Sequence, residues 1–402
     1  MKKLLAILLT LCMVFTLVAC GEEPAPVEPE TPEESEYKIA MITDYGDITD
    51  QSFNQTTYEA CKAFAEANSI DFTYKKPVGD NTADRVAMIE QAIDEGFNVI
   101  VMPGFAFAEA VLTAAPNYPD VKFIALDVAE GDLLAAGVGL AGESYDFNPD
   151  NWDFDKYVKM DNIYCAVYQE ELCGYMAGYA AVKLGYEKLG FLGGMAVPAV
   201  VRYGHGYVQG IDAAAKELDK TVELNYVYGG QFFGNADITA VMDTWYAGGT
   251  EVVFACGGGI YTSAVDASKK VEGSKVIGVD VDQAGVIATY AADPDNSRTV
   301  TSAMKGLYPT TYDTLTDVIL NGNWANYAGK VATLGLVSAD DPEANYVQIP
   351  MGTTQFGEGF TKEDYAALVK AMVEGTVTVS NDISKLPEVT NVTIDDQGSI
   401  VG

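Results

Sequence analysis

Short apolar segments alternate along the chain with longer segments in which apolar residues recur every three or four positions. The short segments predict buried strands, which are Tyr37–Thr43, Asp71–Lys75, Val99–Met102, Val121–Leu126, Asn162–Tyr168, Lys188–Leu192, Thr221–Val227, Glu251–Ala255 and Lys275–Val279. The longer segments predict amphipathic helices, which are Gln55–Asn68, Asn81–Glu95, Ala106–Ala115, Glu170–Leu184, His205–Leu218 and Ala236–Ala247. Strands that alternate with helices at this spacing indicate an α/β fold with parallel sheets and right-handed crossovers.

The first residues follow a different pattern. Lys2 and Lys3 precede an uncharged, mostly apolar run that ends at Val18 and is followed by Ala19 and Cys20. The run is shorter than the roughly 20 residues that a membrane-spanning helix needs. Residues 1–19 are therefore predicted to be a signal peptide. The cleavage point resembles the lipobox of bacterial lipoproteins, which implies an acylated Cys20; in the alternative, a plain signal peptide, Cys20 is incidental.

Residues 20–36 have no apolar periodicity. After Cys20 they read GEEPAPVEPETPEESE, with Pro at 24, 26, 29 and 32 among many Glu residues. Such a segment buries too little apolar surface to offset the entropy of ordering its backbone. Proline and like-charge repulsion extend the chain, so the segment is predicted to be a tether that lifts a domain off a membrane. The alternative is a disordered tail with no spacing role.

Composition narrows the function classes. The 402 residues carry a formal net charge of −34, which repels nucleic acid phosphates and anionic lipid head groups, so nucleic-acid binding is excluded. An apolar content of 49% with 20% charged residues is typical of a globular protein. The chain beyond the tether is too long for one compact core and suits two lobes.

Cysteine and histidine content argues against a metal centre and against several kinds of catalysis. Cys61, Cys165, Cys173 and Cys256 form no C-x-x-C pair, so no zinc site and no cofactor are predicted. Buried free thiols are expected, and a Cys165–Cys173 disulfide is the alternative. A Ser-His-Asp set would need His205, which is expected to be a surface or packing residue, and no phosphate-binding loop is present. We therefore predict a binding protein and not an enzyme.

Acidic residues follow several predicted strands. Asp44, Asp127 and Asp280 each stand directly after a strand, and small-residue turns at 102–104 and 257–259 follow two others. Each Asp taken alone is better explained as a helix N-cap. In open α/β sheets, however, ligands bind outside the carboxyl ends of the strands. Together these residues predict one ligand crevice.

Several segments resemble the basic membrane protein (BMP) family of lipoproteins. They are Asp50–Gln55 (DQSFNQ), Gly174–Ala181 (GYMAGYAA), Leu189–Met195 with Pro198, Val276–Gln283 (VIGVDVDQ) and Thr301–Lys305 (TSAMK), the last interpreted as a helix start. In order and spacing the resemblance covers about residues 37 to 310. Three parts depart from the family pattern: a long acidic, aromatic segment at 141–161, the turn after Met195, and the stretch from Leu320 to the end.

The resemblance implies a type I periplasmic-binding-protein fold, in which two doubly wound lobes enclose a ligand cleft and the chain crosses between them three times. Residues 37–165 with 284–325 are expected to form the N-terminal lobe. Residues 166–283 with 326–402 are expected to form the C-terminal lobe. The 141–161 segment is expected to rim the cleft.

The same resemblance implies how an aromatic base is held. By position, Asp44 bonds the edge of a purine base, Phe53 stacks on one face, and Asn54 belongs to the same site. Phe232 or Phe233 supplies the second face, and the two cannot both face a ligand in an extended segment. Phe232 is the expected one, because it keeps the G-x-F spacing of the family. The alternative for Phe53 is an apolar anchor of the helix that follows it.

The resemblance also implies how a sugar is held. Asp280 and Lys305 bond the ribose hydroxyls, and Asp127 also reaches the ligand. Carboxylates accept strong hydrogen bonds from adjacent hydroxyls. An acidic pocket with one lysine disfavours phosphate, so nucleosides are expected to bind better than nucleotides. The alternative for Lys305 is a solvated helix residue.

The predicted function is that of a lipid-anchored protein on the extracytoplasmic face of the cell membrane. It captures a purine nucleoside by lobe closure and delivers it to the permease of an ATP-binding-cassette (ABC) importer. Two alternatives remain open. One is a protein of the same fold that binds another small polar ligand, such as a sugar or a signalling molecule; the other is a calcium-dependent nucleoside hydrolase.

Overall fold

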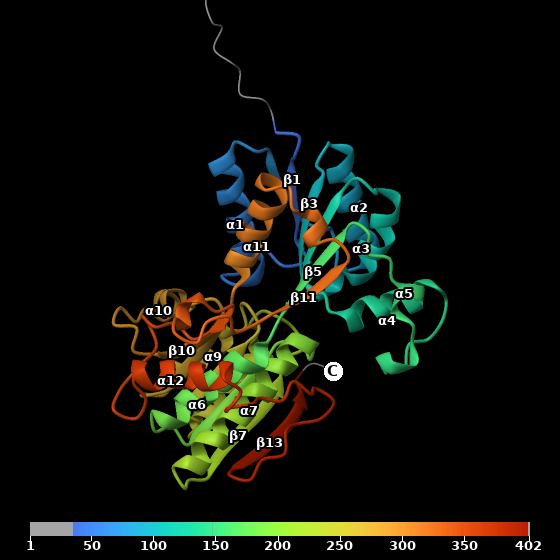
Figure 1. Cartoon of the computed structure of the whole chain (residues 1–402). Coiled ribbons are helices and arrows are strands. Elements are labelled where there is room, and N and C mark those ends of the chain that lie inside the picture. The colour runs from blue at the N-terminus through green and yellow to red at the C-terminus, as the bar shows by residue number, and fades with distance from the viewer. Residues whose placement is uncertain (1–34, 147, 401–402) are drawn as a thin grey trace, which may run out of the picture. The chain divides into compact units, whose positions relative to one another are not determined.

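The computed structural model describes residues 35–146 and 148–400. The predicted signal peptide, the acylated Cys20 and nearly all of the tether lie outside the described residues. Residues 36 onward form one compact unit, and its elements are shown in Figure 1. None of the described helices combines the length and the apolar character that crossing a bilayer requires.

The first lobe is built on a parallel sheet with the strand order β11-β5-β4-β3-β1-β2. Its strands are β1 (Ile39–Ile42), β2 (Phe72–Lys75), β3 (Val99–Pro103), β4 (Lys122–Leu126), β5 (Ile163–Tyr168) and β11 (Lys330–Leu334). Its helices are α1 (Phe53–Asn68), α2 (Thr82–Asp94), α3 (Ala108–Ala114), α4 (Glu130–Leu140), α5 (Phe154–Tyr157) and α11 (Leu307–Leu315).

Both faces of this sheet are covered, which explains why its central strands are apolar at every position. In β1, Ile39 and Met41 pack into one core with α1 and α11, while Ala40 and Ile42 pack into another with α2 and α3. Figure 1 shows α1 and α11 on one side of the sheet and α2 and α3 on the other. Continuous apolar runs of this kind are typical of parallel strands between two helix layers.

The second lobe has the strand order β12-β10-β9-β8-β6-β7-β13, parallel except for β12. Its strands are β6 (Lys188–Gly193), β7 (Val222–Tyr228), β8 (Val252–Cys256), β9 (Lys275–Asp280), β10 (Thr299–Lys305), β12 (Val347–Gln348) and β13 (Val392–Ser399). One face packs against α6 (Glu170–Lys183), α7 (Pro198–Glu217) and α12 (Lys362–Val373), and the other against α8 (Ala236–Ala247), α9 (Tyr261–Ser268) and α10 (Ala284–Ala291).

The predicted fold class is confirmed: two doubly wound α/β lobes are present, and every predicted strand is found within a few residues of its predicted bounds. Within the described residues the chain passes from one sheet to the other after β5, after β10 and after β11. Both sheets therefore contain strands that are far apart in sequence.

The predicted lobe boundaries at 284 and 326 were wrong. Residues 284–305, assigned to the N-terminal lobe, form α10 and β10 of the second lobe, and β11, assigned to the C-terminal lobe, pairs with β5 of the first. The segment Thr301–Lys305 is the end of a strand and not a helix start. Its β-branched neighbours Thr299 and Val300 are fully buried beside β9, an environment that favours a strand.

Helix α7 begins at Pro198, seven residues before the predicted start, with the proline in its first turn. It packs closely on α6 because small residues face each other. A Cβ atom added to Gly206 would lie 2.0 Å from the carbonyl oxygen of Glu171. His205 lies within α7, is buried, and its Nδ1 is 3.1 Å from the carbonyl oxygen of Asp382. The close approach of Gly206 to Glu171 places the third turn of α7 against the first turn of α6.

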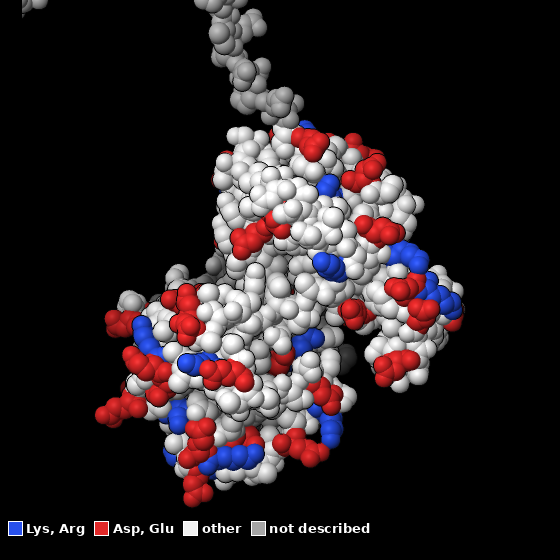
Figure 2. All heavy atoms as spheres, in the orientation of Figure 1, with Lys and Arg blue, Asp and Glu red and all other residues white. Residues whose placement is uncertain are grey.

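The four cysteines that the structure describes are free and buried. The 141–161 segment lies at the surface of the first lobe and includes α5. The Trp152 ring centroid lies 5.8 Å from that of Tyr145 and 5.5 Å from that of Tyr157, and Trp152 Nε1 donates to Asp146 at 2.7 Å. On the face shown in Figure 2, acidic side chains are spread over both lobes, in agreement with the negative net charge.

Candidate functional site

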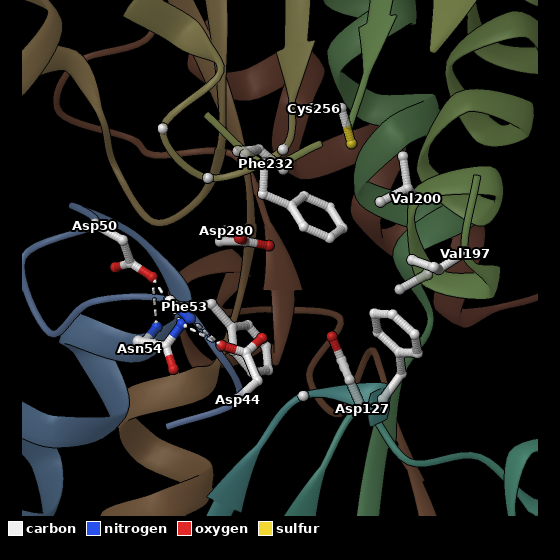
Figure 3. A pocket seen from close by; sticks show the side chains of 18 of the residues that line it. Asp44, Asp50, Phe53, Asn54, Asp127, Val197, Val200, Phe232, Cys256 and Asp280 are labelled. Carbon is white, nitrogen blue, oxygen red and sulfur yellow. Dashed lines mark hydrogen bonds between the residues drawn. The ribbon is translucent and has the colours of Figure 1, made fainter. Parts of the chain in front are cut away.

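The carboxyl ends of both sheets meet at a cavity of about 380 Å³ between the lobes. This volume is in the range of small-molecule sites. All the residues predicted to bind a ligand line it: Asp44, Phe53, Asn54, Asp127, Phe232, Asp280 and Lys305. Figure 3 shows how their side chains lie, apart from that of Lys305. The 141–161 segment contributes none of the described residues that line the cavity, and its expected place at the rim of the cleft stays a prediction.

The first turn of α1 carries two of these side chains, and the loop before the helix holds them in place. Asp50 accepts hydrogen bonds from the backbone N–H groups of Ser52 and Asn54 at 2.9 Å and of Gln55 at 3.1 Å. These donors are the unpaired N–H groups of the first helical turn, which a side-chain carboxylate commonly satisfies. Phe53 and Asn54 are thereby fixed at the start of α1, facing the cavity (Figure 3).

Asp44 follows β1 and lies next to this loop. Its Oδ1 accepts from the backbone N–H groups of Tyr45 at 2.6 Å and Gly46 at 2.7 Å, and from Asn54 Nδ2 at 3.2 Å. Burial raises the pKa of Asp44, and these hydrogen bonds oppose the increase. The buried Oδ1 of Asn54 has no hydrogen-bond partner among the described residues. We call Asp44, Asp50 and Asn54 the Asp44 end of the cavity.

Lys305 lies at the end of β10, buried among carboxylates. Its Nζ is 2.5 Å from Asp127 Oδ2, 3.5 Å from Glu170 Oε1 and 3.6 Å from Asp280 Oδ1. Burial disfavours the ammonium ion, but the three carboxylates outweigh that effect and raise the pKa of Lys305. We call Lys305 and these carboxylates the Lys305 cluster.

Asp127 and Asp280 occupy equivalent places at the ends of β4 and β9. Both have positive φ angles, 59° and 65°, which non-glycine residues rarely adopt outside functional sites and tight turns. Burial raises the pKa of Asp127 to about 6, with a further contribution from Glu170, against the opposing charge of Lys305. Its buried Oδ1 has no hydrogen-bond partner in the described part of the chain. A donor from a ligand would satisfy it.

Asp280 connects the two lobes. Its Oδ2 accepts from the Ser52 hydroxyl of the first lobe at 2.6 Å, and its Oδ1 accepts from the Tyr203 hydroxyl at 3.3 Å. Nearby, Gln283 Nε2 donates to the carbonyl oxygen of Gln51 at 3.2 Å. Direct hydrogen bonds therefore hold the DQSFNQ loop against the carboxyl end of β9.

Two phenyl rings from different lobes project into the cavity. Phe53 is half-buried, and its ring centroid lies 4.7 Å from Lys305 Nζ. Phe232 is half-buried and lies against Gly194, where an added Cβ atom would come within 2.5 Å of the ring. Phe233 also lines the cavity but is 57% exposed. Figure 3 shows the Phe53 and Phe232 side chains directed into the cavity.

Sequence reasoning missed the helix starts that complete the wall. Val197 and Pro198 at the start of α7 form an apolar surface, and Ala129 and Asp132 at the start of α4 face the same cavity. Arg202 also lines it, and its Nε donates to Glu170 Oε2 at 2.6 Å. Proline in a first helical turn is the sequence signal that would have located the start of α7.

The chemistry available here is recognition of a small polar molecule with an apolar, flat part. Carboxylates at strand ends accept hydrogen bonds, Lys305 donates them, and two rings offer flat surfaces. Among the described residues there is no group of three or more His, Cys, Asp or Glu side chains placed to hold a metal ion.

Comparisons with known proteins agree with this architecture. Residues 37–340 match the family model described as ABC transporter substrate-binding protein PnrA-like (Bmp). The ABC transporter nucleoside-binding protein BmpA of Lactococcus lactis subsp. cremoris is 26% identical, over 62% of this chain and 65% of that protein, just under two thirds of its length. Basic membrane protein A1 of Borrelia garinii subsp. bavariensis is 25% identical, over 84% of this chain and 88% of its own.

Among solved structures, a solute-binding protein of an ABC transporter system from Aeropyrum pernix K1 has a similar fold. Its TM-score is 0.61 at 19% identity, covering 86% of this chain and 88% of that one. Because the family model spans well over half of the sequence, the chain belongs to the Bmp family of ABC transporter substrate-binding proteins.

Proposed function

We propose that this protein captures purine nucleosides outside the cell membrane and presents them to an ABC importer. The observation that carries the proposal is the joint presence, in one cavity, of two phenyl rings from different lobes and the Lys305 cluster. A nucleoside has the matching parts, because its base is flat and aromatic and its ribose carries vicinal hydroxyls.

The rings and the Asp44 end suit the base. Phe53 and Phe232 lie on different lobes and offer one flat surface each. Stacking on an aromatic ring contributes about 1–3 kcal/mol per base in nucleic-acid sites. Asn54 Nδ2 already donates to Asp44 and Asp50, so the Asp44 carboxylate and Asn54 Oδ1 remain as acceptors, and they suit the N–H donors on a purine edge.

The Lys305 cluster suits the ribose. A buried polar atom left unpaired costs about 1–3 kcal/mol, and Asp127 Oδ1 is such an atom. A ribose hydroxyl is a donor that pairs with it. Asp280 accepts from, and Lys305 donates to, the vicinal hydroxyls. The hydrogen bond from Ser52 to Asp280 supports lobe closure, because it joins the two lobes beside this subsite.

The remaining parts of the proposal come from the family and the sequence. The Lactococcus relative is named as a nucleoside-binding protein, which supports the choice of ligand. An acylated Cys20 and the Pro- and Glu-rich tether would hold the domain at the extracytoplasmic face. There the closed lobes would be presented to a permease.

We further propose binding without conversion. Asp127, Glu170 and Asp280 share the ammonium group of Lys305. A cation already occupies the position where a catalytic calcium ion would need these carboxylates. The protein itself therefore supplies the cation that these carboxylates share.

Calorimetric titration and thermal unfolding of the purified chain test the proposal. Guanosine, inosine and adenosine should bind and raise the melting temperature, because a ligand that binds only the folded state stabilises it. Arabinose, galactose and inosine 5′-monophosphate should bind far more weakly. A sugar that binds more tightly than every nucleoside would replace the proposed ligand class. Release of hypoxanthine from inosine in the presence of calcium would show that the protein hydrolyses nucleosides, and the proposal of binding without conversion would be wrong.

A further inference from the structure

Two charged residues of the cavity wall have no role in the site as proposed so far. Arg202 lies in the second turn of α7 in the second lobe, and Asp132 lies in the first turn of α4 in the first lobe. Both line the cavity. They therefore face the same space from different lobes.

The guanidinium of Arg202 is held in place from one side. Its Nε donates to Glu170 Oε2 at 2.6 Å, and Glu170 is fully buried in the first turn of α6. The close packing of α6 on α7 fixes the backbone on both sides of this bond. Neither η nitrogen donates a hydrogen bond to another described residue. Arg202 therefore offers two oriented donors to the cavity.

Asp132 is held in a similar way. Its Oδ2 accepts from the backbone N–H of Ala129 at 2.9 Å, while Oδ1 accepts no hydrogen bond from the described residues. Burial raises the pKa of Asp132, while the hydrogen bond from Ala129 and the positive charge of Arg202 oppose the increase. Among the described residues, Asp132 thus keeps one acceptor and Arg202 two donors without a partner, and both side chains line the same cavity.

The position of this pair relative to the ligand follows from shared contacts. Glu170 accepts from Arg202 through Oε2 and lies 3.5 Å from Lys305 Nζ through Oε1. Arg202 is thus hydrogen-bonded to one member of the Lys305 cluster, which is assigned to the ribose. The Asp44 end belongs to a different loop, before α1. Beyond the vicinal hydroxyls, the polar group that remains on a nucleoside sugar is the 5′-hydroxyl, which both donates and accepts.

We propose that Arg202 and Asp132 form a subsite for the 5′-hydroxyl group of the nucleoside, an inference that rests on the proposed function. Arg202 donates to the 5′ oxygen, and the 5′-hydroxyl donates to Asp132 Oδ1. The subsite selects a free hydroxyl. A 5′-phosphate places negative charge against Asp132, and a 5′-deoxy sugar leaves the donors of Arg202 unpaired.

The test compares three ligands by calorimetric titration of the purified full chain: inosine, 5′-deoxyinosine and inosine 5′-monophosphate. The unaltered protein should bind inosine roughly tenfold or more tightly than 5′-deoxyinosine. In Arg202→Met and Arg202→Lys this preference should fall to about twofold or less, because both variants lack the forked donors. Arg202→Lys keeps the charge opposite Glu170, so it remains informative if Arg202→Met does not fold.

Two further variants sharpen the test. Asp132→Asn keeps the size of the side chain and removes its charge, so it should narrow the gap between inosine and the 5′-monophosphate. Lys216→Met removes one positive charge from the far end of the same helix, where Lys216 pairs with Asp212, and should leave the ligand preferences unchanged. Thermal unfolding shows that each variant is folded.

The outcomes separate this inference from the proposed function. If the unaltered protein binds inosine and 5′-deoxyinosine equally well, the subsite does not exist, although nucleoside binding stands. If folded Arg202 variants keep the full preference, Arg202 does not supply it. If no nucleoside binds at all, the proposed function fails and the subsite falls with it.

Discussion

The two ends of the cavity are built in different ways. The Asp44 end is local, because Asp44, Asp50 and Asn54 lie within a short stretch of one lobe and bond one another. The Lys305 cluster joins distant parts of the chain, since Lys305 and Asp127 are 178 positions apart and belong to different lobes. The Asp44 end can therefore form in an open protein, whereas the Lys305 cluster is complete only when the lobes meet. This difference predicts that recognition of the base edge precedes closure, while stacking on Phe232 and recognition of the sugar accompany it.

The largest effect is expected from Lys305→Met. It removes the cation shared by three buried carboxylates, and breaking a buried ion pair from one side costs about 3–5 kcal/mol of folding stability. Urea denaturation should show that loss, and titration should show no measurable nucleoside binding. Lys270→Met is the matched control, because its pair with Asp243 is exposed, and it should change stability by less than about 1 kcal/mol. Equal losses of folding stability in the two variants would mean that the Lys305 cluster does not hold the two lobes together.

A smaller effect is expected from the rings. Phe53→Ala and Phe232→Ala should each weaken nucleoside binding by roughly 10- to 100-fold, in line with about 1–3 kcal/mol per stacked base. Phe233→Ala, which truncates the exposed neighbour, should change binding about twofold or less. If Phe233→Ala has the larger effect, the second stacking face is assigned to the wrong ring. Calorimetric titration with inosine measures all three.

The contrast between the Asp44 end and the Lys305 cluster also explains how much of this site the sequence alone predicts. The strands were predicted because parallel strands covered on both faces are apolar at every position. The acids that follow them, Asp44, Asp127 and Asp280, could be expected at the carboxyl edge. Lys305 was selected through a family motif, but its strand was mistaken for a helix start because the pattern in TSAMK is too short to distinguish the two.

Arg202 and Glu170 were not predicted at all. An acidic residue in a first helical turn is ordinary, because it complements the helix dipole, so nothing marks Glu170 as a buried ion-pair partner. Arg202 reaches the cavity only because α7 starts at Pro198 and packs closely on α6. The lobe boundaries failed for a related reason: a crossing such as the one after β10 leaves no compositional signal when the next helix starts within two residues.

A moderate pH effect is expected at the Lys305 cluster. The pKa of Asp127 is raised to about 6 from the usual 3.8, so between about pH 4 and 6 the folded protein binds more protons than the unfolded chain. The contribution of Asp127 to stability therefore decreases as the pH rises through that window. The affinity for a nucleoside instead increases as the pH rises, because a ligand hydroxyl donates to the ionised carboxylate of Asp127.

Titrations of the purified chain at several pH values measure this effect. Affinity for inosine should fall about tenfold between pH 7 and pH 5, since one pH unit below the pKa leaves about a tenth of the carboxylate ionised. Asp127→Asn should bind weakly at every pH and show a flatter profile in this range. A profile that is equally steep in Asp127→Asn would assign the titration to another group.

The smallest effect is expected from Ser52→Ala, which acts on closure without removing a charge. The Ser52 hydroxyl donates to Asp280 across the lobes at 2.6 Å, and such a bond contributes about 0.5–1.5 kcal/mol net, or more when the acceptor is charged. Inosine affinity should fall roughly three- to tenfold, chiefly through faster dissociation, because the closed form is less stable. Stopped-flow measurement separates the two rates. If Ser52→Ala changes the association rate of inosine but not its dissociation rate, Ser52 acts in the open protein. Recognition of the base would then not precede closure, contrary to what the local construction of the Asp44 end predicts.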